Sequence, residues 1–353
     1  MEASPGSALA STSRPLPPRS VSPPAPTHLP PHRPRTMTTA NSAREIRITR
    51  LYDAPVALVW NAWIDDAQVS QWWGPRGFSI TTHSQELRPG GFWDYTMHGP
   101  DGKDWPNFTR YHEVVPQQRL VYDHGASSAD SAPIFQVTAT FRELNGQTEL
   151  VMTMTLPTPE AAQQTRAFIK AAGGNATWDR LGEYVEKQMS NADVFIINRS
   201  FDAPIDTMYD MWTQPEHFAK WLPPTGFTME FRRVNLVEGG DAFYAMGNGA
   251  FTMYGHVQYL RLERPHRVEY VQNFADEHEN ISRHPGAPVW PEKMHTTVLL
   301  TAEGPSTTRV TVRWSVFGAA TPEEIAAFVK ERGGMTQGWT GSFDKLEAVL
   351  ADR

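Results

Sequence analysis

Leu51–Phe78 reads LYDAPVALVWNAWIDDAQVSQWWGPRGF, and Ser200–Phe227 repeats its pattern as SFDAPIDTMYDMWTQPEHFAKWLPPTGF. The Asp-Ala-Pro triplet begins at Asp53 in the first stretch and at Asp202 in the second, an offset of 202 − 53 = 149 residues. At this offset two tryptophans and the closing Gly-Phe also coincide, in the pairs Trp63/Trp212, Trp72/Trp221, Gly77/Gly226 and Phe78/Phe227. Because solenoid repeats are several times shorter, this period indicates two copies of one whole domain.

Length and composition set limits on the class of protein. A chain of 353 residues predicts two domains or slightly more, and a unit of about 150 residues can bury a core of its own. The net charge of −7 argues against binding to nucleic acid or to anionic membranes, which needs basic surface. No run of about 18 apolar residues predicts a membrane span. Cysteine is absent, which excludes disulfides and thiolate sites, and we expect a cytoplasmic protein.

Residues 1–43 differ from the rest of the chain. They contain 10 of the 29 prolines, four arginines and a single acidic residue, Glu2. Such a segment cannot bury enough apolar surface to fold, so we expect a disordered Pro/Arg-rich tail. Two alternatives remain open: an over-long start with Met37 as the true initiator, or a targeting peptide, although its prolines oppose the amphipathic helix that such signals need.

Each repeat predicts the same order of elements. A strand over 45–52 is followed by a helix with the apolar stripe Val56, Val59, Trp60 and Trp63, and by a second short helix through Trp72. Next come strands at 92–98, 108–115, 119–122, 134–143 and 148–156, with counterparts at 254–262, 267–272, 294–302 and 309–316. Near the end of each repeat a helix is expected to start at Thr158-Pro159 and at Thr321-Pro322. The glycine pairs Gly173-Gly174 and Gly333-Gly334 are expected to end these helices, and a longer amphipathic helix then closes each repeat.

This order predicts an α+β fold. The terminal helix is the only element long enough to cover the apolar face of a curved antiparallel sheet. We therefore expect two tandem helix-grip domains, over 44–190 and 194–353, after the tail. The linker between them is so short that the two domains are expected to pack on each other.

The residues that carry this order resemble a known superfamily. The first repeat resembles the SRPBCC superfamily of START-like, birch-pollen-allergen-like domains in five motifs. They are DAP-x4-W-x2-W from Asp53, the WWGP helix stop, RPGG before a strand, the GPDG hairpin and a closing helix that begins near W-x2-L. Within it, both repeats look like the domain homologous to the activator of the ninety-kilodalton heat-shock protein's ATPase. The resemblance covers 45–190 and 194–352. The second repeat departs from it where Trp73 becomes Leu222 and where an extra loop runs over Asn273–Pro291.

The resemblance implies an apolar cavity between the sheet and the long helix. Many relatives bind lipids, sterols or polyketides there, some are cyclases or hydrolases, and the namesake is a co-chaperone. The aromatic and Met stripes could fill a solid core or line such a cavity. On the second interpretation, the expected ligand-binding residues are Trp93, Tyr95, Met97, Trp178, Leu181, Tyr244, Met246, Trp314, Trp339 and Phe343.

No motif of a nucleophile elbow, a phosphate-binding loop or a metal site is present, so we assign no catalytic residue, no metal and no cofactor. His112, His256 and His295 lie on predicted strands and could be polar groups of the cavity, against the plainer interpretation of surface or core histidines. His278 and His284 belong to the extra loop, which is expected to form a solvated flap over the cavity mouth.

The leading hypothesis is therefore binding of a small hydrophobic ligand. The alternatives are an enzyme of the cyclase or hydrolase kind that uses His112 or His256, and a chaperone-associated protein with a chaperone as its partner.

Overall fold

The computed structural model describes residues 43–171, 175–190, 193–284 and 286–353. These belong to one compact unit. The tail predicted for 1–43 lies outside the described residues except at Ala43, and so does the glycine pair Gly173-Gly174. Among the helices of the described part, none is long and apolar enough to cross a membrane.

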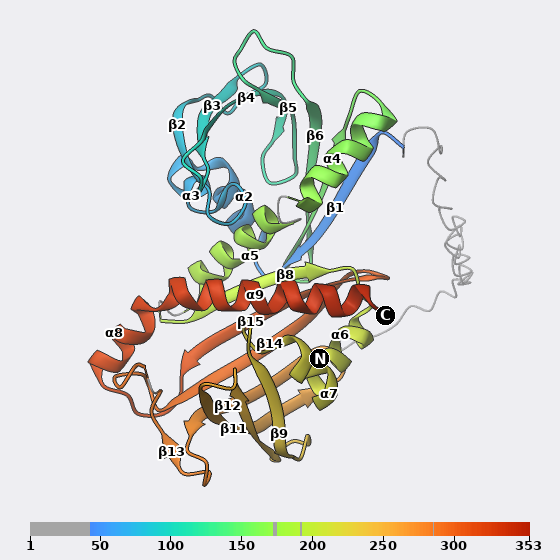
Figure 1. Cartoon of the computed structure of the whole chain (residues 1–353). Helices are drawn as coiled ribbons and strands as arrows, with labels where there is room; N and C mark the ends of the chain where they lie inside the picture. Colours follow the sequence, from blue (N-terminus) through green and yellow to red (C-terminus); the bar gives the residue numbers. More distant parts are fainter. Residues whose placement is uncertain (1–42, 172–174, 191–192, 285) are drawn as a thin grey trace, which may run out of the picture. The chain divides into compact units, whose positions relative to one another are not determined.

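The first repeat contains seven strands and four helices within the described residues (Figure 1). They are β1 (Glu45–Tyr52), α2 (Val56–Ile64), α3 (Asp66–Trp72), β2 (Ser79–Gln85), β3 (Phe92–His98), β4 (Asp104–Val115), β5 (Arg119–Ala126), β6 (Phe135–Leu144), β7 (Gln147–Thr155), α4 (Pro159–Ala171) and α5 (Ala176–Met189).

The second repeat has the same order with one added short strand, β13, in the extra loop. Its elements are β8 (Phe195–Phe201), α6 (Ile205–Thr213), α7 (Pro215–Trp221), β9 (Thr228–Val234), β10 (Asp241–Gly247), β11 (Thr252–Glu263), β12 (Arg267–Ala275), β13 (Ile281–Ser282), β14 (Lys293–Gly304), β15 (Thr307–Val316), α8 (Pro322–Lys330) and α9 (Arg332–Ala351).

Both sheets are antiparallel and have one topology. The first runs β1-β7-β6-β5-β4-β3-β2, and the second runs β8-β15-β14-β12-β11-β10-β9, with β13 paired to β12. The first strand of each repeat pairs with its last, as in the register Ile48↔Met152 and Ile197↔Val312. The α+β helix-grip fold predicted from the sequence is therefore confirmed for both repeats.

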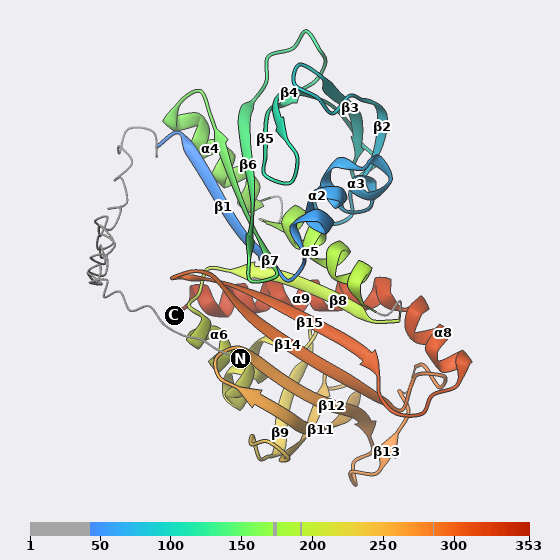
Figure 2. The same ribbon diagram turned by 180° about the vertical axis from the view of Figure 1, so that it is seen from behind.

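The long helix of each repeat covers one face of its own sheet. Figure 1 shows α9 lying across the second sheet, and Figure 2 shows the same strands from behind, with the helix on the far side. The contact that repeats in both copies is a pair of stacked indoles. Trp63 of α2 stacks on Trp178 of α5 at 5.3 Å between ring centroids, and Trp212 stacks on Trp339 of α9 at 5.9 Å. Such offset aromatic pairs add to the area that they bury.

A second tryptophan fixes the short helix pair. The Nε1–H of Trp72 donates to the carbonyl of Ala62 at 2.8 Å, and that of Trp221 donates to Met211 at 2.9 Å. Both rings are fully buried. Because a buried indole N–H needs an acceptor, this bond explains why tryptophan occupies the same place in both repeats.

Helix α5 has a second buried face, and it is acidic. Asp179, Glu183 and Glu186 follow the spacing i, i+4, i+7 and are all buried. Glu183 accepts two bonds from Arg76 and one from the main-chain N–H of Asn198 on β8, at 2.9 Å.

The partners of the other two acids include residues of the second repeat. Glu186 accepts from Arg313 of β15 at 3.0 Å, and Asp179 lies 3.6 Å from Arg50 of β1. Arg50 in turn donates to Glu303 of β14 at 2.8 Å. A buried ionic cluster therefore joins residues of the two sequence repeats.

Candidate ligand-binding cavity

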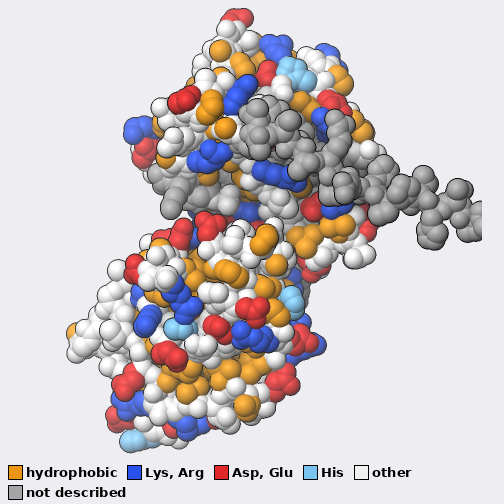
Figure 3. Space-filling model, turned by 90° about the vertical axis from the view of Figure 1, so that its right-hand side faces the viewer, with side chains coloured by type: hydrophobic (Ala, Val, Ile, Leu, Met, Phe, Trp, Pro, Cys, Tyr) orange, Lys and Arg blue, Asp and Glu red, His pale blue; other side chains and the backbone are white. Residues whose placement is uncertain are grey.

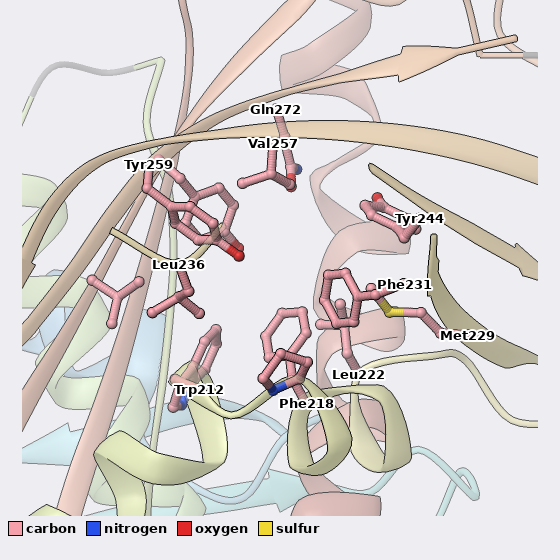
Figure 4. A pocket seen from close by; sticks show the side chains of 13 residues that line it. Trp212, Phe218, Leu222, Met229, Phe231, Leu236, Tyr244, Val257, Tyr259 and Gln272 are labelled. Atoms are coloured by element: carbon pink, nitrogen blue, oxygen red, sulfur yellow. The ribbon is translucent and has the colours of Figure 1, made fainter. Parts of the chain in front are cut away.

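A cavity of about 30 Å³ lies in the second repeat between the sheet and the helices α6 and α7 (Figure 4). Side chains of the helices face those of the strands across it, as Figure 4 shows for Trp212 and Phe218 against Val257 and Tyr259. None of the residues around it is charged. They are Trp212, Pro215, Phe218, Leu222, Met229, Phe231, Leu236, Tyr244, Val257, Tyr259, Val268, Tyr270 and Gln272.

The alternation of side chains along the strands brings the sheet side of this cavity together. Val257 and Tyr259 of β11, like Tyr270 and Gln272 of β12, are two residues apart and so point to the same face of the sheet. Tyr244 of β10 is cross-strand from Gly255, and its ring lies over that glycine. A Cβ added there would lie 2.2 Å from the Tyr244 Cζ atom, so only glycine admits the ring in this position.

The corresponding space in the first repeat is filled by tryptophan. Trp73, which aligns with Leu222, packs edge-on against Trp93 with ring centroids 5.4 Å apart, and its Nε1–H donates to the Tyr95 hydroxyl at 3.1 Å. Trp93, which aligns with Ala242, stacks on Tyr95 at 4.0 Å. The aromatic cluster of the first repeat is thus closed by two indole rings that the second repeat lacks.

Large-to-small replacement explains the cavity. Leu222 and Ala242 remove two indoles, while Phe218 in place of Val69 and Phe231 in place of Thr82 return only part of that volume. Because protein interiors relax incompletely around a lost side chain, a void remains.

The two repeats also hold the wall of this space differently. In the first repeat the Arg180 guanidinium lies within hydrogen-bond distance of five main-chain carbonyls between Gln71 and Phe78, at 2.8 to 3.3 Å. In the second repeat, Ser342 donates to the Leu222 carbonyl and Lys345 to that of Pro223, each at 2.7 Å. The segment that carries Leu222 is therefore held by fewer bonds than its counterpart.

The cavity is electrically neutral. Burial raises the pKa of Tyr244 to about 12 and that of Tyr259 also to about 12, so both phenols stay protonated at neutral pH. In the first repeat His124 occupies the position of Gln272, with its ring 5.1 Å from that of Phe135. Burial lowers the pKa of His124 to about 4, and its Nδ1 atom has no hydrogen-bond partner among the described residues. This imidazole is neutral at pH 7.

Of the ten expected ligand-binding residues, Tyr244 alone lines this cavity. Trp93, Tyr95, Trp178 and Leu181 are part of the core of the first repeat, and Met97 packs against it. Trp339 and Phe343 belong to the core of the second repeat, Trp314 packs against that core, and Met246 is buried outside the cavity.

The three candidate histidines do not line the cavity. Each follows or precedes an inward residue and so points to the other face of its sheet, where it pairs with a carboxylate on a neighbouring strand. The pairs are His112 with Asp123 at 2.8 Å, His256 with Asp241 at 3.0 Å and His295 with Glu269 at 2.7 Å. This position corrects the expectation that they are polar groups of the cavity and removes the support for an enzyme that uses His112 or His256.

The extra loop does not cover the cavity either. His278 is exposed beside Glu277, and His284 packs edge-on against Phe274. Arg283 binds Glu324 of α8 at 2.6 Å, which holds the loop against that helix. Among the described residues, no group of three or more His, Asp or Glu side chains could hold a metal ion. On the face in Figure 3, basic and acidic side chains are interspersed.

Comparison with known proteins places this geometry in a family. The family model described as Activator of Hsp90 ATPase homolog 1-like protein matches residues 53–186 and 202–351. The chain belongs to this family. No curated protein matched the chain.

Three of the similar solved structures differ in how much of this chain they cover. A protein of Nitrosomonas europaea is 21% identical over 43% of this chain and 99% of its own, with a TM-score of 0.39. A protein of Arthrobacter aurescens is 24% identical over 42% and 90%, with a TM-score of 0.38. The di-domain ARO/CYC BexL from the BE-7585A biosynthetic pathway is 16% identical over 86% and 98%, with a TM-score of 0.36.

In this member of the Activator of Hsp90 ATPase homolog 1-like family, sequence reasoning missed most of the cavity wall. Phe231, Tyr259 and Gln272 lie on strands, but their inward orientation follows only from the register. One signal was present: the second repeat departs from the first where Trp73 becomes Leu222 and where Trp93 becomes Ala242.

Proposed function

We propose that the protein binds a small hydrophobic molecule in the cavity of its second repeat, and that the first repeat serves as a closed structural partner. The observation that carries this proposal is the replacement of Trp73 and Trp93 by Leu222 and Ala242, which opens an uncharged apolar space between sheet and helices. A largely apolar lining with a few polar groups is typical of ligand sites.

The cavity must widen to admit such a molecule. Its volume of about 30 Å³ would hold one or two waters, whereas pockets for drug-sized ligands are about 300 to 1,000 Å³. Phe218, Leu222 and Phe231 are only half-buried and stand at the edge of the sheet, where α7 meets β9. Rotation of these side chains enlarges the space without moving a fully buried residue, so we expect entry between α7 and β9.

Isothermal titration calorimetry with 2-naphthol, a small neutral aromatic probe, tests the proposal. The full chain should bind it, and Leu222→Trp, which restores the residue of the first repeat, should weaken binding at least tenfold because the indole fills the space. Thermal unfolding shows whether Leu222→Trp folds. If it does not fold, the smaller substitution Leu222→Phe is used in its place. Equal binding by the wild type and by a folded filled variant, or no binding by the wild type, would refute the proposal.

The natural ligand can be sought in the same preparation. Native mass spectrometry of the purified chain should reveal a bound small molecule that is absent from Leu222→Trp. The family's description names an activator of the Hsp90 ATPase. Stimulation of a purified Hsp90 ATPase by Leu222→Trp as strongly as by the wild type would assign that activity to a surface other than the cavity.

A further inference from the structure

Three polar side chains of the second repeat converge on the cavity without a partner. Tyr244, Tyr259 and Gln272 come from the adjacent strands β10, β11 and β12 and reach into the same space in Figure 4. None of the three has a hydrogen bond to another described residue. Tyr259 is only 6% exposed. Tyr244 and Gln272 are half-buried. A few polar groups in an otherwise apolar pocket commonly fix the polar atoms of a ligand, so this set, which has no partner in the described chain, points to a partner from outside.

The first repeat satisfies two of these three positions with protein groups, whereas the Nδ1 atom of His124, at the position of Gln272, has no partner among the described residues. Tyr95, the counterpart of Tyr244, accepts from the Trp73 indole at 3.1 Å. Tyr111, the counterpart of Tyr259, accepts from the Gln85 amide at 3.4 Å. The main chain supports the second equivalence: the Gly90 N–H donates to the Tyr111 carbonyl as the Gly239 N–H does to that of Tyr259.

The second repeat has lost both of these donors. Leu222 stands in place of Trp73 and Val234 in place of Gln85, and neither side chain can form a hydrogen bond. The two tyrosines remain. The second repeat has therefore kept its polar groups, lost their internal partners and gained a void beside them.

We propose that Tyr244, Tyr259 and Gln272 form the polar end of the ligand site, and that this end selects neutral molecules with a hydroxyl or carbonyl group over both hydrocarbons and carboxylates. The inference rests on the proposed function. Phenol and amide groups can donate to a carbonyl and accept from a hydroxyl. No cation lines the cavity, so a carboxylate would be buried without a counter-charge, which is strongly unfavourable.

Three probes of similar shape separate these classes: naphthalene, 2-naphthol and 2-naphthoate, each titrated calorimetrically into the full chain at pH 7. We expect 2-naphthol to bind more tightly than naphthalene by roughly 2- to 10-fold, the worth of one hydrogen bond. The carboxylate should bind at least 100-fold more weakly than 2-naphthol.

Tyr259→Phe removes one hydroxyl and keeps the ring. It should weaken the binding of 2-naphthol by roughly 2- to 10-fold and leave the affinity for naphthalene unchanged. Tyr254→Phe is the matched control, because Tyr254 lies on the same strand, stacks on Phe243 and does not line the cavity. It should change neither affinity. If Tyr259→Phe proves neutral, the double variant Tyr244→Phe/Gln272→Leu tests the other two groups.

The outcomes separate this inference from the function on which it rests. Equal affinity for naphthalene and 2-naphthol, or tight binding of 2-naphthoate, overturns the polar selection while cavity binding stands. Binding of 2-naphthol that is insensitive to all of these hydroxyl and amide variants overturns it as well. Failure of every probe to bind overturns both proposals together.

Discussion

At the scale of single residues, Trp73 fills the position in the first repeat that Leu222 occupies beside the cavity of the second. Its ring contacts those of Trp63, Trp93 and Trp178, and its Nε1–H satisfies the Tyr95 hydroxyl. Replacement by leucine, the residue of the second repeat, leaves a cavity and an unpaired buried phenol. We expect Trp73→Leu to lower the free energy of unfolding by about 2 to 4 kcal/mol, as measured by urea denaturation.

The control for this prediction is Trp105→Leu. Trp105 is 52% exposed, so the same substitution should change stability by less than about 0.5 kcal/mol. A further consequence is that Trp73→Leu should let the first repeat bind 2-naphthol, so that titration shows two sites where the wild type shows one. Equal stability of the two variants would mean that the packing of Trp73 does not stabilise the first repeat.

At the scale of elements, α5 shows what a sequence pattern reveals and what it does not. The sequence predicts the stripe Trp178, Leu181, Val185 and Met189 as the apolar face of this helix. The first three are buried in the core of their own repeat, whereas Met189 is 47% exposed. The stripe Asp179, Glu183 and Glu186 is the kind of pattern that ordinarily indicates a solvated face. Its burial depends on arginines far away in the sequence, such as Arg313, so no local pattern could predict it.

The edge strands β2 and β9 were missed for a related reason. β2 reads SITTHSQ and β9 reads TMEFRRV, and most of their side chains are exposed or half-buried. A strand at the edge of a sheet lacks the regular apolar alternation that identifies a strand. The break between the last helices was also misplaced. It falls at Glu331, and Gly333-Gly334 lie inside the first turn of α9.

The acidic face of α5 predicts a pH dependence. Burial raises the pKa of Asp179 to about 7, although the nearby Arg50 acts in the opposite direction. Between pH 4 and 7 the folded state therefore holds a proton that the unfolded state has lost, and stability falls as pH rises through this window. Asp179→Asn has no titratable group at this position, so the stability of the variant should fall less steeply with pH than that of the wild type. The two slopes should differ by up to about 1.4 kcal/mol per pH unit.

Urea midpoints at several values between pH 4 and 8 give the comparison. The wild type and Asp179→Asn should be close in stability at pH 4, and the variant should be the more stable of the two at pH 8. Parallel curves over this range would show that Asp179 does not titrate there.

At the scale of the whole molecule, the two repeats share a fold and differ in their interiors. The doubled sequence predicted the α+β topology of both, because apolar periodicity decides which face of a strand or helix is buried. The family resemblance implies a cavity in each copy, but periodicity does not say whether side chains fill the space. That outcome depends on summed side-chain volumes, and where the second repeat has Leu222 beside a cavity, the first has the Trp73 ring packed on its neighbours.

Glu303 lies at the centre of the ionic cluster between residues of the two repeats. The Glu303 side chain is 1% exposed, and it accepts from Arg50 at 2.8 Å and from Ser200 at 2.7 Å, with Arg309 at 3.5 Å. Glu303→Ala leaves two buried guanidinium groups short of a counter-charge. We expect it to lower the free energy of unfolding by about 3 to 5 kcal/mol, a shift in the urea midpoint of roughly 1 M or more.

Glu263→Ala is the matched control for this prediction. Glu263 pairs with Arg261 on the surface of β11, and an exposed pair is worth at most about 1 kcal/mol. Arg50 comes from the first repeat and Glu303 from the second. The double variant Arg50→Met/Glu303→Leu removes both of these charges and should therefore cost less than the sum of Arg50→Met and Glu303→Leu, although Arg309 and Asp179 still lose a partner. If Glu303→Ala costs no more than Glu263→Ala, the cluster contributes nothing to holding the two repeats together, and their association depends on apolar contacts alone.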